Sequence, residues 1–455
     1  MNTFLSFCAE ERTARPSGCR FVAFGRAPAR AAFLGFVSLA LVFGCLLTAS
    51  WCPPAIAAEG AKLDSLSIEV PAHPRPIAAT CPLPQNVRLP EGGARWTDQG
   101  LAGSEPLQVA PAILPNGLPS EQQQDLMLVV PPSPPEAAAN QNKRIYSLAA
   151  LEQAPQSPFS FHQSEGVTLR IEQSGKPVLA YNFGTITNEK VPLTEHRRSR
   201  ACYVHPVWGL SGEVLTDDFP KDHYHHHGIF WTWPHVKIDG QQHDLWAGAT
   251  IAQRFERWLV RRSGPLAAVL AVENGWYVGP KRVMRERVWI RVWRATETSR
   301  CVDFDLTFIP EDRPIELWGA EGKSYGGFTM RFKPGPRSET LITVPQGKTS
   351  EDLPDTPLAW ADFTSKFDGA TQRSGAAVFV PPHHPDFPPT WLTRYYGPLC
   401  VGWPGVKSKT FPPGEPIRLS YRVWIHRSAV EPEDLAAAYA DYEAAAKVRA
   451  IAPAR

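Results

Sequence analysis

Strand-like alternation of apolar and polar residues is the feature that most constrains the fold of this chain of 455 residues. From residue 159 onward it recurs in segment after segment, most clearly in Arg285–Trp293, Cys301–Ile309 and Ile417–Ile425. A period of two means that one face of each strand packs against a core, while the other face meets solvent or a second layer. The pattern over 159–428 predicts a large two-sheet antiparallel supersandwich.

Proline content supports an all-β class. Pro accounts for 46 of the 455 residues, about twice the usual share. Because Pro is poorly tolerated inside helices, this content disfavours a mostly helical protein. Only residues 431–449 have the pattern of a helix, since the segment is rich in Ala and its apolar positions lie three and four apart.

The segment 62–150 is rich in Pro but also contains strand-like stretches. Ser65–Val70, Asp125–Val130 and Lys143–Leu148 are short runs bounded by turn residues. We expect a small N-terminal β domain here, and the alternative is a disordered linker. Ala154–Pro158 marks the expected boundary with the large domain.

The first 58 residues have the pattern of a targeting segment. Five Arg precede an apolar run from Ala31 to Ala49, and Ala55 and Ala57 provide small residues before a cleavage point. This pattern predicts a signal peptide, with an uncleaved N-terminal membrane anchor as the alternative. Both place the rest of the chain outside the cytoplasm, secreted or periplasmic, and no other apolar run is long enough to cross a membrane.

Charge excludes one class of partner. Without the five Arg and two Glu of the leader, 42 basic residues face 43 acidic ones. Nucleic-acid binding relies on a basic excess, so we expect no nucleic-acid partner.

Cysteines give no support for a Cys-based zinc site. Four of the eight lie in the leader, and the chain has no CxxC spacing. The other four are compatible with one or two disulfides or with buried free thiols, and they are Cys81, Cys202, Cys301 and Cys400.

Histidines gather in one region, because seven of the 13 lie between residues 205 and 243. On a strand, His223, His225 and His227 would project to one face and His226 to the other. Two imidazoles spaced in this way suit a metal ion, with His205 or a carboxylate as a third ligand. The same groups suit acid/base catalysis without a metal. A solvated loop or a structural hydrogen-bonding cluster is the remaining interpretation.

Several segments resemble, in the same order, motifs of the bacterial DUF6807 family of uncharacterised proteins, which often carry the label methane oxygenase PmoA. The family usually shows Asp-His-Pro-His-His-Arg-Gly, where this chain has Tyr224 in place of Pro and His227 in place of Arg. The resemblance spans roughly 160–445 and implies a fold similar to the galactose-mutarotase supersandwich, which is common among sugar epimerases, lyases and hydrolases. The matching segments are Tyr203–Val207, Asp217–Trp231, Lys323–Phe328, Trp360–Phe363 and Trp391–Gly397.

Aromatic and charged residues offer a substrate-binding set. Indole faces stack on sugar rings, so Trp231 and Trp391 are candidates for the wall of a cleft, with core filling as the alternative. Glu321, Lys323, Tyr325 and Arg331 surround a Gly-rich turn, where Glu321 would act as a base and Lys323 would polarise a hydroxyl, or the set is surface charge. Arg394 would clamp a carboxylate, or it pairs with a structural Asp.

The leading hypothesis is an extracytoplasmic carbohydrate-active protein that performs acid/base chemistry, meaning epimerisation, elimination or hydrolysis, on a sugar or glycan. The alternatives are a non-catalytic glycan-binding module and a metal-dependent hydrolase or oxidase that uses His223 and His225 as ligands. The sequence requires no cofactor, and it is compatible with a bound divalent metal ion. Asp222 would orient an imidazole of the catalytic set, which is His205, Asp222, His223, His225 and His226.

Overall fold

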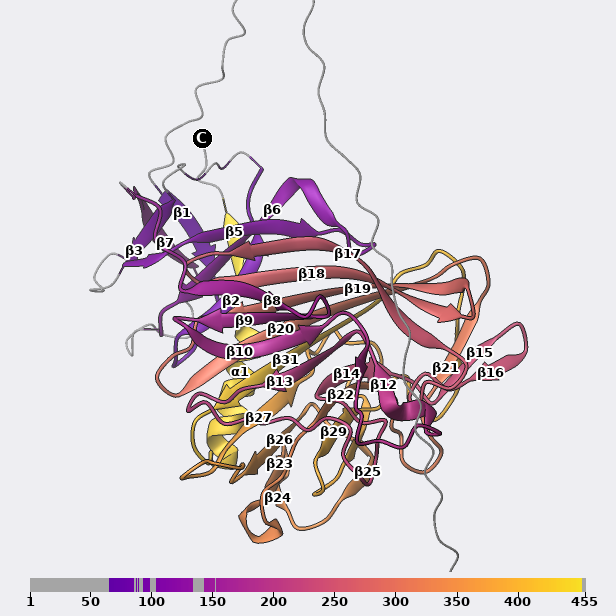
Figure 1. Cartoon of the computed structure of the whole chain (residues 1–455). Helices are drawn as coiled ribbons and strands as arrows, with labels where there is room; N and C mark the ends of the chain where they lie inside the picture. The colour runs from indigo at the N-terminus through magenta and orange to yellow at the C-terminus, as the bar shows by residue number, and fades with distance from the viewer. Residues whose placement is uncertain are drawn as a thin grey trace, which may run out of the picture. The chain divides into compact units, whose positions relative to one another are not determined.

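Two large antiparallel sheets dominate the computed structural model, which describes residues 65–451 except 86, 88, 90–92, 99–103, 134–142 and 152. Within these residues each sheet has nine strands (Figure 1). The order in the first sheet is β25 (Leu353–Pro357), β28 (Thr390–Thr393), β29 (Pro398–Val401), β22 (Gly327–Arg331), β14 (Ile229–Thr232), β13 (Tyr203–Val207), β10 (Lys176–Asn182), β9 (Thr168–Gln173) and β8 (Phe159–Ser164).

The second sheet contains the longest strands of the large domain. Strands β17 to β20 run side by side as a meander, and β31 follows β20 in the sheet (Figure 1). The order is β17 (Ala252–Ser263), β18 (Ala267–Val278), β19 (Lys281–Trp293), β20 (Ser299–Pro310), β31 (Ile417–His426), β27 (Ser374–Phe379), β26 (Trp360–Ser365), β23 (Leu341–Val344) and β24 (Gly347–Thr349).

The main core lies between these two sheets. In β20, Val302, Phe304 and Leu306 are buried in it, while the alternate positions Asp303 and Asp305 face the other way. Burying each large apolar side chain contributes about 1.5–3 kcal/mol. The all-β prediction and the two-sheet antiparallel architecture are therefore confirmed, and the strands expected at 285–293, 301–309 and 417–425 fall within β19, β20 and β31.

The segment before residue 151 forms strands, as predicted. A three-stranded sheet packs on the outer face of the second large sheet, where Ala110 and Met127 contact a cluster that includes Trp289 and Trp293. This cover explains why both faces of β19 are buried. The strands of the whole segment are β1 (Ser65–Glu69), β2 (Ile77–Pro82), β3 (Ala94–Asp98), β4 (Ser104–Pro106), β5 (Gln108–Ile113), β6 (Pro119–Val130) and β7 (Lys143–Ala150). Of these, β2, β6 and β5 form the three-stranded sheet.

Helix α1 (Pro432–Ala445) packs Leu435, Ala438 and Tyr439 against the second sheet. It ends before the expected residue 449, because the chain turns after Ala445 and strand β32 (Arg449–Ile451) pairs with β1. No helix within the described residues combines the length and apolarity needed to cross a bilayer. The predicted signal peptide or anchor lies outside these residues.

Smaller elements complete the described residues. One four-stranded sheet joins β16 (Gln241–His243), β15 (His235–Ile238), β21 (Ile315–Trp318) and β30 (Lys409–Phe411). Strands β11 (Ile186–Thr187) and β12 (Ser199–Arg200) pair, and two short 3₁₀ helices are η1 (His196–Arg198) and η2 (Arg337–Glu339). The four cysteines of the described residues carry free thiols, namely Cys81, Cys202, Cys301 and Cys400.

Candidate functional site

The histidine-rich segment forms a turn structure, here called the His loop (residues 217–228), between β13 and β14. The backbone N–H of His223 donates to the carbonyl of Pro220, and that of His226 donates to the carbonyl of His223, both at 2.9 Å. Asp218 and His227 then form an isolated antiparallel bridge. The side chains therefore do not alternate between two faces as they would on a strand. Pro220, which lacks a backbone N–H donor, favours the turn over a strand.

The turn stacks aromatic rings against one another. The imidazoles of His223 and His226 lie nearly parallel, with centroids 4.6 Å apart, and His225 is edge-on to both. Tyr396, from the turn between β28 and β29, lies parallel to His223 with centroids 4.9 Å apart. The guanidinium of Arg331 lies 4.9 Å from the centre of the Tyr396 ring. Segments far apart in the sequence thus meet at the His loop.

Burial keeps the imidazoles of His225, His226 and His227 neutral. It lowers the pKa of His225 to about 3, and it lowers the pKa values of His226 and His227 well below the ordinary histidine value. Neighbouring cations add to the effect, Arg331 for His226 and Arg200 for His227. At neutral pH these rings can accept or donate hydrogen bonds without carrying charge.

Asp218 links two buried side chains. Its carboxylate accepts one hydrogen bond from the Tyr203 hydroxyl at 2.8 Å, and it is 2.7 Å from Nδ1 of His227. Burial raises the pKa of Asp218 to about 6. Because the imidazole of His227 is neutral, its Nδ1–H is the donor of the second bond. Asp218 thereby fixes the tautomer of His227 and the path of the loop.

Replacement of Asp218 by Ala is expected to destabilise the protein by about 2 kcal/mol, because the buried donors of Tyr203 and His227 would each lose their acceptor. Denaturant unfolding of the purified protein measures this change. Asp222→Ala is the matched control: its side chain is half exposed, so we expect a loss of less than about 0.5 kcal/mol. Equal losses in the two variants would contradict this role of Asp218.

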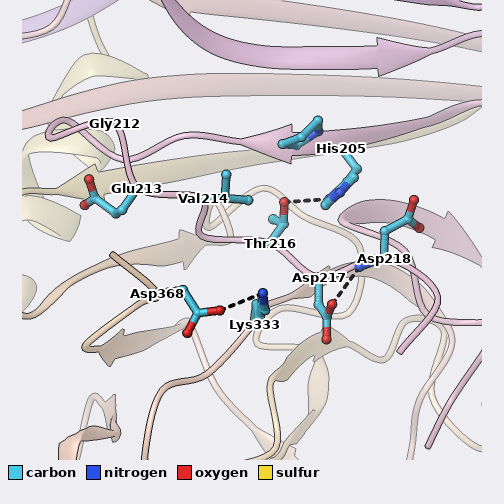
Figure 2. A pocket seen from close by; sticks show the side chains of 10 residues that line it. His205, Gly212, Glu213, Val214, Thr216, Asp217, Asp218, Lys333 and Asp368 are labelled. Atoms are coloured by element: carbon cyan, nitrogen blue, oxygen red, sulfur yellow. Dashed lines mark hydrogen bonds and ion pairs between the residues drawn. The ribbon is translucent and has the colours of Figure 1, made fainter. Parts of the chain in front are cut away.

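A hollow of about 430 Å³ opens beside the His loop (Figure 2). Strand β13 contributes His205, the following loop contributes Gly212 to Asp218, and the segments after β22 and β26 contribute Lys333 and Asp368. We call it the first hollow. Its volume lies within the range of small-molecule sites, and its lining mixes carboxylates, an imidazole and an amine.

Among the titratable groups of the first hollow, His205 and Asp217 are best suited to proton transfer. Nδ1 of His205 lies 3.0 Å from Oγ1 of Thr216, and burial lowers the pKa of this imidazole. Burial raises the pKa of Asp217, whose carboxylate accepts a hydrogen bond from the backbone N–H of Asp218 at 3.0 Å. A histidine kept neutral and a carboxyl that holds its proton to higher pH form a matched base and acid.

Arg331 joins the first hollow to the stacked rings. One Nη of this buried guanidinium lies 3.7 Å from Asp217 and 3.6 Å from Asp222. Asp222 in turn lies 2.8 Å from Nδ1 of His223. The proposed catalytic set is therefore brought into one neighbourhood: His205 lines the hollow, while Asp222, His223, His225 and His226 lie beyond Arg331.

The expected substrate-binding set is largely dispersed. Trp231 and Trp391 are 0% exposed, and the indole N–H of Trp391 donates to the carbonyl of Leu358. Neither ring has a face open to a ligand, because both fill the core between the sheets. Arg394 pairs with Asp352 at 3.0 Å, which is the structural pairing rather than a free clamp.

The Gly-rich turn after β21 does not reach the first hollow. Glu321 and Lys323 are exposed on it, and neither lines the first hollow. Tyr325 comes near the His loop, because its ring lies 4.9 Å from Trp246, whose indole is edge-on to His226.

Sequence reasoning missed Asp217, Asp218 and Lys333. The two aspartates belong to the segment that carries the family resemblance, and their position next to the histidines was the available signal. Lys333 follows β22 with no motif of its own, and only the fold brings it to the hollow.

A metal centre finds little support in this geometry. The rings of His223 and His225 are edge-to-face with centroids 5.6 Å apart. Within the part of the chain that the structure describes, no group of three or more His, Cys, Asp or Glu side chains is arranged to hold a metal ion.

Comparison with known proteins identifies the family of this chain. Residues 168–440 match DUF6807, a family of unknown function, and this range contains the His loop and every residue of the first hollow. No curated protein matches the chain. The match extends over more than half of the sequence, and the chain belongs to the DUF6807 family.

Proposed function

We propose that this protein is an extracytoplasmic carbohydrate-active enzyme that performs acid/base chemistry on a sugar ring in the first hollow. The lining supports this proposal, since carboxylates, an imidazole and an amine can bond to the alternating donors and acceptors of sugar hydroxyls. The hollow is large enough for a small ligand.

One observation carries the proposal: His205 and Asp217 line the same hollow with pKa values displaced in opposite directions. His205 is neutral at pH 7 and can take a proton from the sugar through Nε2. Asp217, when protonated, can give a proton to the opposite position or to a departing oxygen. Epimerisation, elimination and hydrolysis all need such a pair.

A non-catalytic glycan-binding module is the second candidate, favoured by Tyr396. This ring is 36% exposed and lies parallel to His223, with Arg331 against it. The exposed part of an aromatic ring held in a fixed orientation can contact a sugar.

Turnover of a sugar library by the purified protein tests the enzyme. Proton NMR in D₂O detects deuterium incorporation, unsaturated products and new reducing ends in one assay. We expect turnover by the wild type, a loss of at least about a hundredfold in Asp217→Asn, and full activity in Glu321→Gln, which alters an exposed carboxylate outside the first hollow. Binding without turnover would favour the module. If the folded protein neither binds nor turns over any sugar, both candidates are refuted.

A further inference from the structure

A second hollow of about 310 Å³ adjoins the first. The two share Gly212, Glu213 and Asp368 in their linings, so they lie next to each other. Beyond the shared residues, the second hollow is lined by the turn that carries Ala370, Thr371 and Gln372, and by Arg427. We call the two hollows together the groove, and its lining includes His205 from the first hollow and Arg427 from the second.

Glycine keeps the junction of the two hollows open. Gly212 has a φ of +92°, and a Cβ placed on it would meet no atom within 4 Å. Gly369, in the second hollow, has a φ of +76° and equally open surroundings. Side chains at these positions would be strained and would project into free space. Gly212, which lines both hollows, therefore places no side chain in the open space beside it.

The walls of the second hollow are held in place by hydrogen bonds. Glu213 is buried and accepts bonds from the Ser374 hydroxyl and from the backbone N–H of Ser211. Arg427 donates to the Ser211 hydroxyl at 3.1 Å and to the carbonyl of Glu297 at 2.8 Å. A wall fixed in this way loses little conformational entropy when a ligand binds.

The charge of the groove selects among glycans. Even without Asp217, which is the proposed acid, its carboxylates Glu213, Asp218 and Asp368 outnumber its two cations. These cations are Lys333, which pairs with Asp368 at 2.7 Å, and Arg427. Carboxylates accept hydrogen bonds from sugar hydroxyls, but their excess repels a ligand that carries its own carboxylates. A neutral glycan suits this lining better than an acidic one.

We propose that the substrate is a neutral oligosaccharide whose reacting ring occupies the first hollow and whose next ring occupies the second, against Ala370 to Gln372. This inference rests on the proposed function and adds the length and charge of the substrate. The second hollow is then a positioning subsite, which contributes binding energy without taking part in proton transfer.

Isothermal titration with neutral gluco-, xylo- and manno-oligosaccharides of one to four rings tests the proposal. We expect affinity to rise about tenfold or more from one ring to two, which corresponds to about 1.4 kcal/mol. Ala370→Trp would fill the second hollow and abolish this rise. Ala252→Trp is the matched control, because Ala252 is exposed on edge strand β17 and lines neither hollow, and it should bind as the wild type does.

Each outcome separates the inference from the function on which it rests. Equal affinity for one ring and two, or a rise that survives in Ala370→Trp, would overturn the second subsite. Equal or tighter binding of glucuronic-acid oligosaccharides would overturn the preference for neutral glycans. Folded wild-type protein that binds no glycan of any length would overturn the carbohydrate function itself.

Discussion

Acidification below pH 6.5 is expected to destabilise this protein steeply, because the His loop must unfold before its imidazoles can take up protons. Burial lowers the pKa of His225 to about 3, and it lowers the pKa values of His226 and His227 well below the ordinary value. In the unfolded chain these groups bind protons near pH 6.5. The unfolded state therefore binds more protons, and stability falls by about 1.4 kcal/mol per pH unit for each imidazole.

Asp218 opposes this effect within a narrower window. Burial raises its pKa to about 6, so between pH 6 and its ordinary value near 3.8 the folded state binds the extra proton. Acidification through that window stabilises the folded state by about 1.4 kcal/mol per pH unit. Burial also raises the pKa of Asp217, so three imidazoles against two carboxyls leave a net loss of at least about 1.4 kcal/mol per pH unit from these groups below pH 6.

Denaturant unfolding followed by tryptophan fluorescence between pH 5 and pH 7.5 measures this slope. In His225→Gln we expect a slope shallower by about 1.4 kcal/mol per pH unit, since this variant lacks one imidazole that binds a proton only in the unfolded state. His162→Gln is the control, because its imidazole is 52% exposed on β8, and its slope should equal that of the wild type. A wild type as stable at pH 5.5 as at pH 7 would contradict the prediction.

Alternation in the sequence was sufficient to predict the fold class because side-chain direction in a strand is a local property. Val302, Phe304 and Leu306 could be assigned to the core from their spacing alone. Spacing does not show whether the opposite face is covered. Trp289 and Trp293 face the N-terminal strands β5 and β6 rather than solvent, and that burial depends on contacts made more than 150 residues away in the sequence.

The candidate site was harder to predict for the same reason. The number and proximity of the histidines identified the region, but their orientation depends on the turn at Pro220 and on partners from distant strands. Tyr396 and Arg331 reach the His loop only because β22 and β29 are neighbours in the first sheet. A tryptophan suited to sugar stacking and one that fills a core have the same sequence signature, and Trp231 and Trp391 proved to be core residues.

Replacement of His205 by Gln is expected to lower kcat about 10²–10⁴-fold on any sugar that the enzyme turns over, because Gln cannot accept the proton that the neutral imidazole takes. The amide of Gln can still bond to Oγ1 of Thr216, which contacts Nδ1 of His205 in the wild type. We therefore expect KM and the free energy of unfolding to change little.

The pH profile of kcat/KM distinguishes a proton-transfer role of His205 from a structural one. Burial lowers the pKa of His205 below the ordinary histidine value, so the acid limb of the wild-type profile should lie below pH 6.5, where this imidazole is protonated. In His205→Gln, kcat/KM should be low and should no longer fall as the pH is lowered. If the substitution only distorted the site, kcat/KM would be low but would still fall in acid. His235→Gln, on β15 and outside the first hollow, should reproduce the wild-type profile. An unchanged kcat in His205→Gln would remove this residue from the chemistry and leave Asp217 without a partner base in the hollow.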